Sequence, residues 1–131
     1  MNVPQISVFV ENRPGRLAHL LQILAEAKIN IRALSVADSA DFGIVRLIVD
    51  DPKEAIDAIH AAGMTGRITS VLRVEVPDEP GALERDVVES LAQAGVNIEY
   101  MYAYGGRLSG TAVIILKVDN LEKAEQALRK S

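Results

Sequence analysis

The stretch "VENRPGRL", residues 10–17, stands between an alternating apolar run and a helix-like pattern, and a relative of it, "VPDEPGAL", returns at residues 76–83. In both stretches a Pro-Gly pair follows a strand-like segment and precedes apolar residues at helical spacing. We call the turn that contains each Pro-Gly pair an elbow. The segment before each elbow repeats as well: "ISVFV" at 6–10 aligns with "LRVEV" at 72–76. Similarity at a fixed spacing is the signature of a duplicated unit, so the sequence predicts two copies of one plan.

The repeat extends over nearly the whole chain. "LLQILAEAKINI" ends at Ile31 and "VVESLAQAGVNI" ends at Ile98, 67 residues later, whereas the two elbows are 66 residues apart. The difference predicts one extra residue in the first helix or turn of copy two. "VDDPKEAIDAI" at 49–59 matches "VDNLEKAEQAL" at 118–128. Each copy therefore reads strand, elbow, helix, "NI", strand, strand, helix.

This element order predicts an α+β fold of two ferredoxin-like βαββαβ repeats, with antiparallel sheets and helices on one face. We place repeat 1 at 1–70 and repeat 2 at 71–131, joined by a long shared strand at about 67–76, because no turn residue interrupts that segment. Copy two ends after its second helix and lacks the last strand. An exposed sheet edge is usually covered, so we expect a homodimer.

Local signals place the remaining elements. Strands are expected at roughly 31–37, 43–49, 98–104 and 110–118, with "SADFG" and "GGRLSG" as the turns between them. Asp51 with Glu54 three residues later is a capping signature for the second helix of copy one, and Asp119 with Glu122 repeats that spacing.

Composition excludes several classes of function. The chain has 131 residues, a net charge of −4 and no cysteine, which argues against a nucleic-acid or anionic-membrane partner and leaves no thiol chemistry. The start lacks the pattern of a signal peptide, so a cytoplasmic protein is expected. His19 and His60 are isolated, and no phosphate-binding loop is present, so we expect neither a metal nor a cofactor.

The motifs "NRPGRL…KINI" and "DEPGAL…GVNI" resemble the ACT domain family, in which a Pro-Gly elbow follows the first strand and a Gly-x-Asn-x motif follows the first helix. "ENRPG" followed by "NI" is especially similar to the serine-sensing ACT domain of phosphoglycerate dehydrogenase. The resemblance covers the chain twice and is closest to small tandem ACT proteins without an attached enzyme. It implies an amino-acid ligand and a regulated enzyme or protein partner.

The resemblance also implies where the ligand lies. ACT sites form where two units meet, with the elbow of one unit facing the post-helix asparagine of the other. Carried over, Asn12 and Asn30 are the polar anchors of copy one, and Asp78 and Asn97 hold those places in copy two. Asp78 departs from the family's asparagine, so the alternatives for the second site are a different ligand or a purely structural role. The expected ligand-binding residues are Glu11, Asn12, Arg13, Gly15, Arg16, Leu17, Asn30, Ile31, Asp78, Gly81, Ala82, Leu83, Asn97 and Ile98.

An elbow of this kind suits a free amino acid. The amides of Gly15, Arg16 and Leu17 at a helix start present donors to a carboxylate. The ammonium needs acceptors, which the Asn12 side chain, carbonyls near Glu11 or the Asp78 carboxylate supply. Structural alternatives remain open here: Arg13 and Arg16 as solvated residues, Asp78 as a helix cap, and Asn30 and Asn97 as turn residues that end a helix.

Three tyrosines in "YMYAY" share one strand face with Ile98, where copy one has small residues. Tyr100, Tyr102 and Tyr104 suit packing or an interface, a ligand pocket, or base stacking, and the last is disfavoured by the acidic chain. The preferred function is a non-catalytic sensor that binds an amino acid at ACT–ACT interfaces. The alternatives are a ligand-free dimerisation module and a small enzyme on a ferredoxin-like sheet, which lacks an evident acid–base pair.

Overall fold

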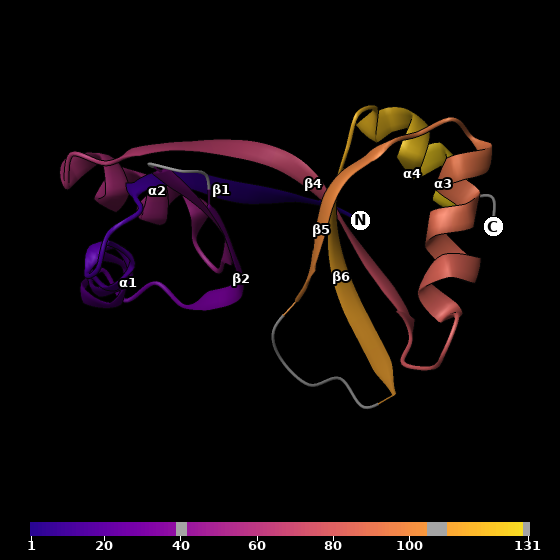
Figure 1. Ribbon diagram of the computed structural model, residues 1–131, viewed down its shortest axis with the longest axis horizontal. Coiled ribbons are helices and arrows are strands. Elements are labelled where there is room, and N and C mark those ends of the chain that lie inside the picture. The colour runs from indigo at the N-terminus through magenta and orange to yellow at the C-terminus, as the bar shows by residue number, and fades with distance from the viewer. Residues whose placement is uncertain (39–41, 105–109, 130–131) are drawn as a thin grey trace. The chain divides into compact units, whose positions relative to one another are not determined.

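The computed structural model of the protein describes residues 1–38, 42–104 and 110–129. Strands and helices alternate in the order expected of two βαββαβ repeats (Figure 1). The elements are β1 (Asn2–Glu11), α1 (Arg16–Glu26), β2 (Ile31–Asp38), β3 (Phe42–Val49), α2 (Pro52–Ala61), β4 (Thr65–Pro77), η1 (Glu84–Val88), α3 (Glu89–Gln93), β5 (Ile98–Ala103), β6 (Thr111–Val118) and α4 (Leu121–Arg129). The predicted α+β class and antiparallel sheets are confirmed, whereas most of the two predicted turns, at 39–41 and 105–109, lies outside the described residues.

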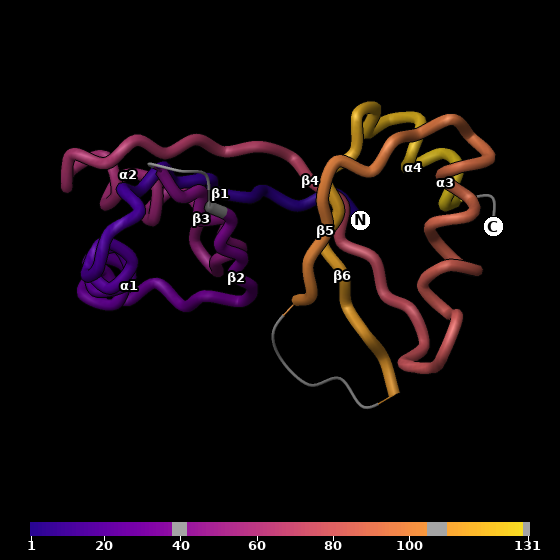
Figure 2. The backbone as a smooth tube through the Cα atoms, viewed as in Figure 1, coloured from indigo at the N-terminus to yellow at the C-terminus, as the bar shows by residue number. Residues whose placement is uncertain are grey.

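Two compact units make up the chain. One unit is Pro4–Thr69, and the other joins Met1–Val3 to the chain from Ser70 onward. The strand order is β2-β3-β1-β4-β6-β5, so the first unit has the ferredoxin-like order β2-β3-β1-β4 and the second has the matching β5-β6-β4. Strand β4 is 13 residues long and serves both units in turn, which Figure 2 shows as one uninterrupted segment.

The first residues of β1 lie where the second repeat would have its last strand, which the sequence lacks. In the order of the second unit, the strand beside β4 on the side away from β6 is β1, and the Arg73 N–H donates to the Met1 carbonyl at 2.6 Å. The expectation of a wholly open edge in copy two is therefore wrong for Met1–Val3. The chain's own first residues cover part of that edge, because β1 is longer than the sheet of the first repeat requires.

Each repeat buries one face of its strands under two helices. In the first repeat, alternate residues of β1 and β3 point to the helices, because successive side chains of a strand alternate between faces. The core of that repeat consists of Ile6, Val8, Val10, Leu20, Leu24, Ile29, Val45, Leu47, Val49, Ala55 and Ile59. The second repeat has its own core around Leu72, Val87, Leu91 and Leu116, so each repeat has a hydrophobic centre of its own.

The extra residue of copy two lies in a wide helical turn. Gly15 and Gly81 are 66 positions apart, but the buried residues Leu20 and Val87 are 67 apart, so the insertion falls between Gly81 and Val87. There the chain forms the π-helical segment η1, in which the N–H of Glu89 donates to the carbonyl of Glu84, five residues earlier. A π turn absorbs one residue without rotating the rest of the helix away from the core.

Helix capping agrees with the sequence in one copy and differs in the other. Asp51 caps α2 as predicted, with its carboxylate accepting from the Glu54 N–H at 3.1 Å. In copy two the cap is Asn120, whose side-chain oxygen accepts from the Lys123 N–H at 3.0 Å. The prediction of Asp119 as that cap is wrong by one residue, because Asp119 binds another part of the chain.

Candidate functional site

The elbow of the first repeat is a tight turn held by backbone hydrogen bonds. The Arg13 N–H donates to the Glu11 carbonyl at 2.9 Å, and the His19 N–H donates to the Gly15 carbonyl at 3.0 Å. Gly15 precedes α1 with φ 89°, a left-handed conformation that only glycine adopts without strain. A Cβ placed on Gly15 would meet nothing within 4 Å. Glycine is therefore required here for its backbone angle, and the space beside it is open.

Two arginines of the elbow share one carboxylate. Arg13 and Arg16 lie 3.1 Å and 3.2 Å from the two oxygens of Glu11. Both arginines therefore form an ion pair within the elbow, whereas the sequence alternative was that they are only solvated. The pairs are exposed to a large degree, so their contribution to stability is small. An ion-paired, water-accessible cluster beside a helix start is able to exchange its partners for a charged ligand.

Backbone donors remain unused at this helix start. The Arg16 N–H, expected to face a ligand, instead donates to the Arg13 carbonyl at 3.3 Å. The N–H groups of Gly15 and Leu17, which were expected donors, and of Ala18, which was not, have no acceptor among the described residues. The exposed Asn12 side chain also forms no hydrogen bond within the described part of the chain. Three backbone amides, of Gly15, Leu17 and Ala18, and one carboxamide thus form no hydrogen bond among the described residues at the positive end of α1.

A pocket of about 250 Å³ adjoins this elbow. Among the predicted residues, Glu11 and Arg16 line it. Sequence reasoning missed the others, which come from β1, α1, β3, the loop that leads into β4 and the first residue of β4. They are Phe9, Val10, His19, Phe42, Ala62, Gly63, Met64 and Thr65. His19 stands one helical turn after Gly15, and that spacing was the available signal for it.

The structure separates Asn30 from the elbow of its own repeat. Helix α1 has 11 residues, which places its two ends about 16 Å apart. Lys28, with φ 61°, is the residue that ends the helix in the left-handed conformation, so Asn30 does not have the helix-ending role considered for it. A site that contains both Asn12 and Asn30 has to take them from two different ACT units.

Asn30 is fixed by its backbone and not by its side chain. Its N–H donates to the Asp50 carboxylate at 3.1 Å, and its carbonyl accepts from the Asp50 N–H at 3.1 Å. The second repeat has the same double link between Asn97 and Asp119, at 3.0 Å and 3.1 Å. This clamp orients the start of β2 or β5 and leaves the asparagine carboxamide without a hydrogen bond among the described residues.

The elbow of the second repeat has the same backbone but different side chains. Gly81 has φ 81°, and the Arg85 N–H donates to its carbonyl at 3.0 Å. Asp78 is exposed, and its N–H donates to the Gly110 carbonyl at 2.9 Å. Ala82 is buried in the core and Leu83 packs against it, so these two support the turn rather than face a ligand with their side chains. Among the described residues, no hydrogen bond joins the Asp78 side chain to the helix start as a cap.

A larger pocket of about 600 Å³ lies beside this second elbow. Its residues are Met1, Arg73, Val74, Glu75, Arg85, Asp86, Val87 and Leu128, none of which was predicted. Arg85 contacts Asp86 and Glu79, both at 3.1 Å, and hydrogen bonding to these two carboxylates raises the pKa of the Arg85 guanidinium above its ordinary value. The pocket thus combines paired charges with an apolar floor.

The tyrosine row lies on the face of its strand away from the helices. A register shift between Ile98 and Tyr100 puts Ile98 against the helix-covered core, so the expectation that it shares the tyrosine face is wrong. Tyr100 and Tyr102 stack with ring centroids 6.4 Å apart, and the Arg73 guanidinium lies 5.1 Å above the Tyr104 ring. The row is built by contacts within the second repeat.

The described residues contain no group of three or more His, Cys, Asp or Glu side chains placed to hold a metal ion. Among the helices that the structure describes, none is long and apolar enough to cross a membrane.

Comparison with known proteins assigns the family. The model of the ACT domain pair matches residues 1–130, so this chain belongs to the ACT domain pair family. Protein BT0572 from Bacteroides thetaiotaomicron is similar in structure with 37% identity and a TM-score of 0.92, over 99% of this chain and 88% of that one. No curated protein sequence matches the chain.

Two more distant structures share the fold. The ligand-free regulatory subunit of aspartate kinase from Thermus thermophilus is 22% identical with a TM-score of 0.68, over 96% of this chain and 88% of that one. The corresponding subunit from Thermus flavus is 19% identical with a TM-score of 0.65, over 97% and 90%.

Proposed function

We propose that this ACT pair is a non-catalytic regulatory sensor that binds a free amino acid at the elbow of its first repeat. The observation that carries the proposal is the conjunction of unused amides, at Leu17 and Ala18, with an exposed Asn12 carboxamide in the same elbow that forms no hydrogen bond among the described residues. Membership of the ACT family and the names of the aspartate kinase regulatory subunits support a regulatory role. The regulated partner is a protein whose activity responds to the ligand.

The proposed binding mode follows from the charges at the elbow. The ligand carboxylate accepts hydrogen bonds from the Leu17 and Ala18 amides at the positive end of α1. The ligand ammonium donates to the Asn12 side-chain oxygen and to an asparagine such as Asn30 of a facing ACT unit. The Asn30 carboxamide is available to a ligand because Asp50 bonds the backbone of Asn30 and not its side chain. The pocket of about 250 Å³ adjoins this site through Glu11 and Arg16, whereas Asn12, Leu17 and Ala18 lie outside its lining, so the pocket volume sets no limit on the ligand.

We further propose that two copies of the chain supply facing units. Strand β2 is at the end of the strand order, and its residues Leu34 and Val36 are 41% and 52% exposed. Exposed apolar residues on an edge strand favour pairing with another strand. Sedimentation velocity tests this: Val36→Lys is expected to convert a dimer into a monomer, and a wild-type monomer would contradict it.

A thermal-shift screen against the twenty amino acids tests the sensor proposal. A ligand at a hundred times its Kd adds about 2.7 kcal/mol, which raises the melting temperature by several degrees. We expect one amino acid or a related group to do so, and Asn12→Ala to abolish the response. Asp78→Ala, at the corresponding position of the second repeat, is the matched control and is expected to keep it. Failure of every amino acid, with carried-over ligand excluded by mass spectrometry, would favour a ligand-free interaction module.

A further inference from the structure

Strand β2 has a free edge. It stands at one end of the strand order, and among the described residues only β3 pairs with it. The register sets Leu34 opposite Leu47 and Val36 opposite Val45. Leu47 and Val45 belong to the core under the helices, so their β2 partners lie on the same face of the sheet, but these partners are exposed. A free edge with exposed apolar side chains is a place where another strand adds readily.

The unpaired backbone groups of this edge belong to the same two residues. The Asp50 N–H donates to the carbonyl just before β2, so Asp50 is directed toward β2. Backbone groups of a strand alternate between its two sides, so Arg46, four residues earlier, is also directed toward β2. Its partner Ser35 is therefore directed toward β3. Leu34 and Val36, on either side of Ser35, direct their N–H and C=O groups to the free edge.

Helix α1 adds an apolar side chain beside this edge. Arg16 and His19 line a pocket with Met64, which follows α2, so the flank of α1 that carries them faces α2. At about 100° per residue, Leu21 lies on the opposite flank, toward β2. Leu21 is half-buried and stands outside the core of its repeat. We call this apolar surface the β2 strip; it consists of Leu21, Leu34 and Val36.

We propose that the β2 edge and the β2 strip bind a second copy of this chain, with the two β2 strands antiparallel about a twofold axis at Ser35. The inference deepens the homodimer proposed above and rests on it, but it does not rest on amino-acid binding. This axis sets Leu34 opposite Val36 of the second copy, once on each side of Ser35. Both residues direct their backbone to the edge, so each pair exchanges two hydrogen bonds.

The order of residues along β2 selects this axis. An axis between two residues would set an edge-directed residue opposite one directed to β3, which breaks the pairing. Axes at positions 33, 34, 36 and 37 each set a charged residue, Arg32 or Asp38, opposite Leu34 or Val36. The axis at Ser35 pairs apolar with apolar. It also brings Arg32 and Asp38 to paired positions, and opposite charges across strands are favourable.

The other face of β2 permits the same approach. Ala33, Ser35 and Ala37 alternate with the residues of the β2 strip and lie on the face away from the helices. With the axis at Ser35, the two serines meet, and each Ala33 stands opposite an Ala37. No bulky side chain of these positions meets another. A twofold contact requires such a self-complementary surface.

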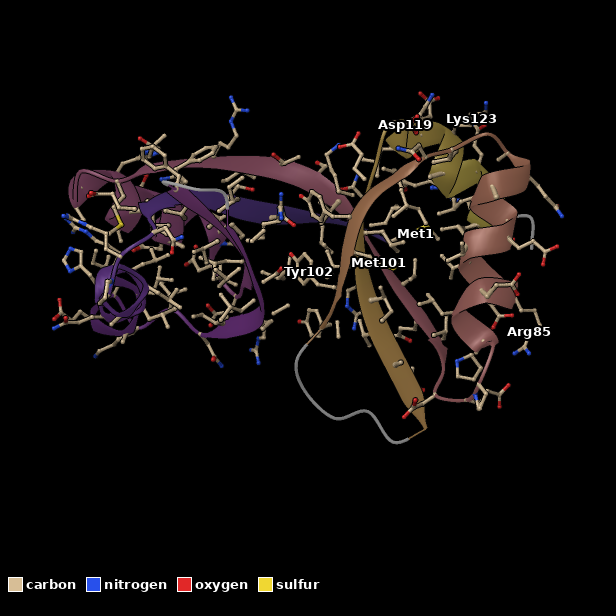
Figure 3. All side chains as sticks on the ribbon, in the orientation of Figure 1. Met1, Arg85, Met101, Tyr102, Asp119 and Lys123 are labelled. Carbon is tan, nitrogen blue, oxygen red and sulfur yellow. The ribbon has the colours of Figure 1, made fainter. Side chains whose placement is uncertain are left out.

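Strand β5, at the other end of the strand order, is less suited to a second copy. Met101 and Tyr102 project to opposite sides of β5 (Figure 3). Among its described residues, Met101 is the single exposed large apolar residue, whereas β2 has two. An axis at Tyr102 would set Met101 opposite Ala103, so exposed apolar residues would not meet in pairs. We therefore assign the contact to β2.

Disulfide trapping tests the axis. The chain has no cysteine, so each single-cysteine variant reports on one position. Opposed residues that exchange no hydrogen bonds have Cα atoms about 4.5 Å apart, which a disulfide spans. We expect Ser35→Cys to form a covalent dimer on mild oxidation. Ala37→Cys is the matched control: it is more exposed, but roughly 14 Å would separate its two copies, so it should cross-link at least about tenfold more slowly.

Three further measurements complete the test. An equimolar mixture of Leu34→Cys and Val36→Cys should cross-link faster than either variant alone, because these positions are opposed. Faster cross-linking of either variant alone than of the mixture would overturn the axis, even if Ser35→Cys does not fold. Sedimentation velocity of the wild type separates the two proposals. A monomer would overturn the homodimer and the axis together, whereas a dimer in which folded Ser35→Cys does not cross-link would overturn the axis alone.

Discussion

Replacing Asp50 with alanine should loosen the start of β2 without changing the Asn30 side chain. The variant removes the carboxylate that accepts from the Asn30 N–H at 3.1 Å, while the return bond from the Asp50 N–H to the Asn30 carbonyl remains possible. A hydrogen bond to a charged group contributes about 1.5–3 kcal/mol to stability. Both residues are exposed, so water replaces part of the interaction, and we expect a loss of about 1 kcal/mol.

Urea unfolding of three variants measures this effect. Asp50→Ala and Asp119→Ala should lower the transition midpoint with an unchanged slope, because the change is in stability and not in the surface exposed on unfolding. Asn30→Ala removes a side chain that forms no hydrogen bond among the described residues, so its effect should stay within about 0.5 kcal/mol. If Asn30→Ala destabilised as much as Asp50→Ala, the separation of a structural backbone from a free carboxamide would be refuted.

Three further changes have defined outcomes. Lys28→Gly should stabilise the protein by about 0.5–1 kcal/mol, because glycine relieves the positive φ of 61°; an unchanged or lower urea midpoint would contradict this. Gly15→Ala should cost about 1 kcal/mol, because alanine is strained at φ 89° even where space is open, and thermal unfolding would show no loss if that reasoning were wrong. Asn120→Ala should cost about 1 kcal/mol by removing the cap of α4, and amide exchange should rise in that helix's first turn; protection equal to wild type would count against the cap.

The duplicated order of strands and helices was predictable because it depends on local sequence patterns. The Pro-Gly elbows, the alternation of strand residues and the Asp51 cap each depend on a few neighbouring residues. The shared strand expected at about 67–76 corresponds to β4 at Thr65–Pro77, because no turn residue interrupts it. Family membership followed from two elbow motifs, each with its "NI" partner at the matching distance.

Features that depend on contacts between distant segments were not predictable. Met1 and Leu128 line one pocket although they lie near opposite ends of the chain. The pairing of β1 with the second half of β4 is a long-range contact, and no local sequence pattern predicts it. The bulge before Tyr100 reverses the face of Ile98, and the spacing of the sequence alone does not reveal a register shift.

The contacts of the first elbow were only partly predictable from the sequence. The sequence placed Gly15 at the turn because a left-handed residue is needed there. It did not show that Glu11 holds both arginines, or that Arg16 uses its amide within the turn. Those contacts depend on the conformation of the turn after folding. They remove Arg16 from the expected anion donors, leave Gly15 and Leu17, and add Ala18.

The most direct test of the central claim is a ¹H–¹⁵N NMR titration of the protein with each of the twenty amino acids. The account predicts that one amino acid, or a related group, shifts the amides of Leu17 and Ala18 and the side-chain amide of Asn12 in a saturable manner, with Asn30 shifting too where two units face each other. The Asn12→Ala variant should lose these shifts at the same ligand concentrations. The absence of saturable shifts for all twenty, or shifts that leave the first elbow unchanged, would contradict the assignment of this elbow as an amino-acid site.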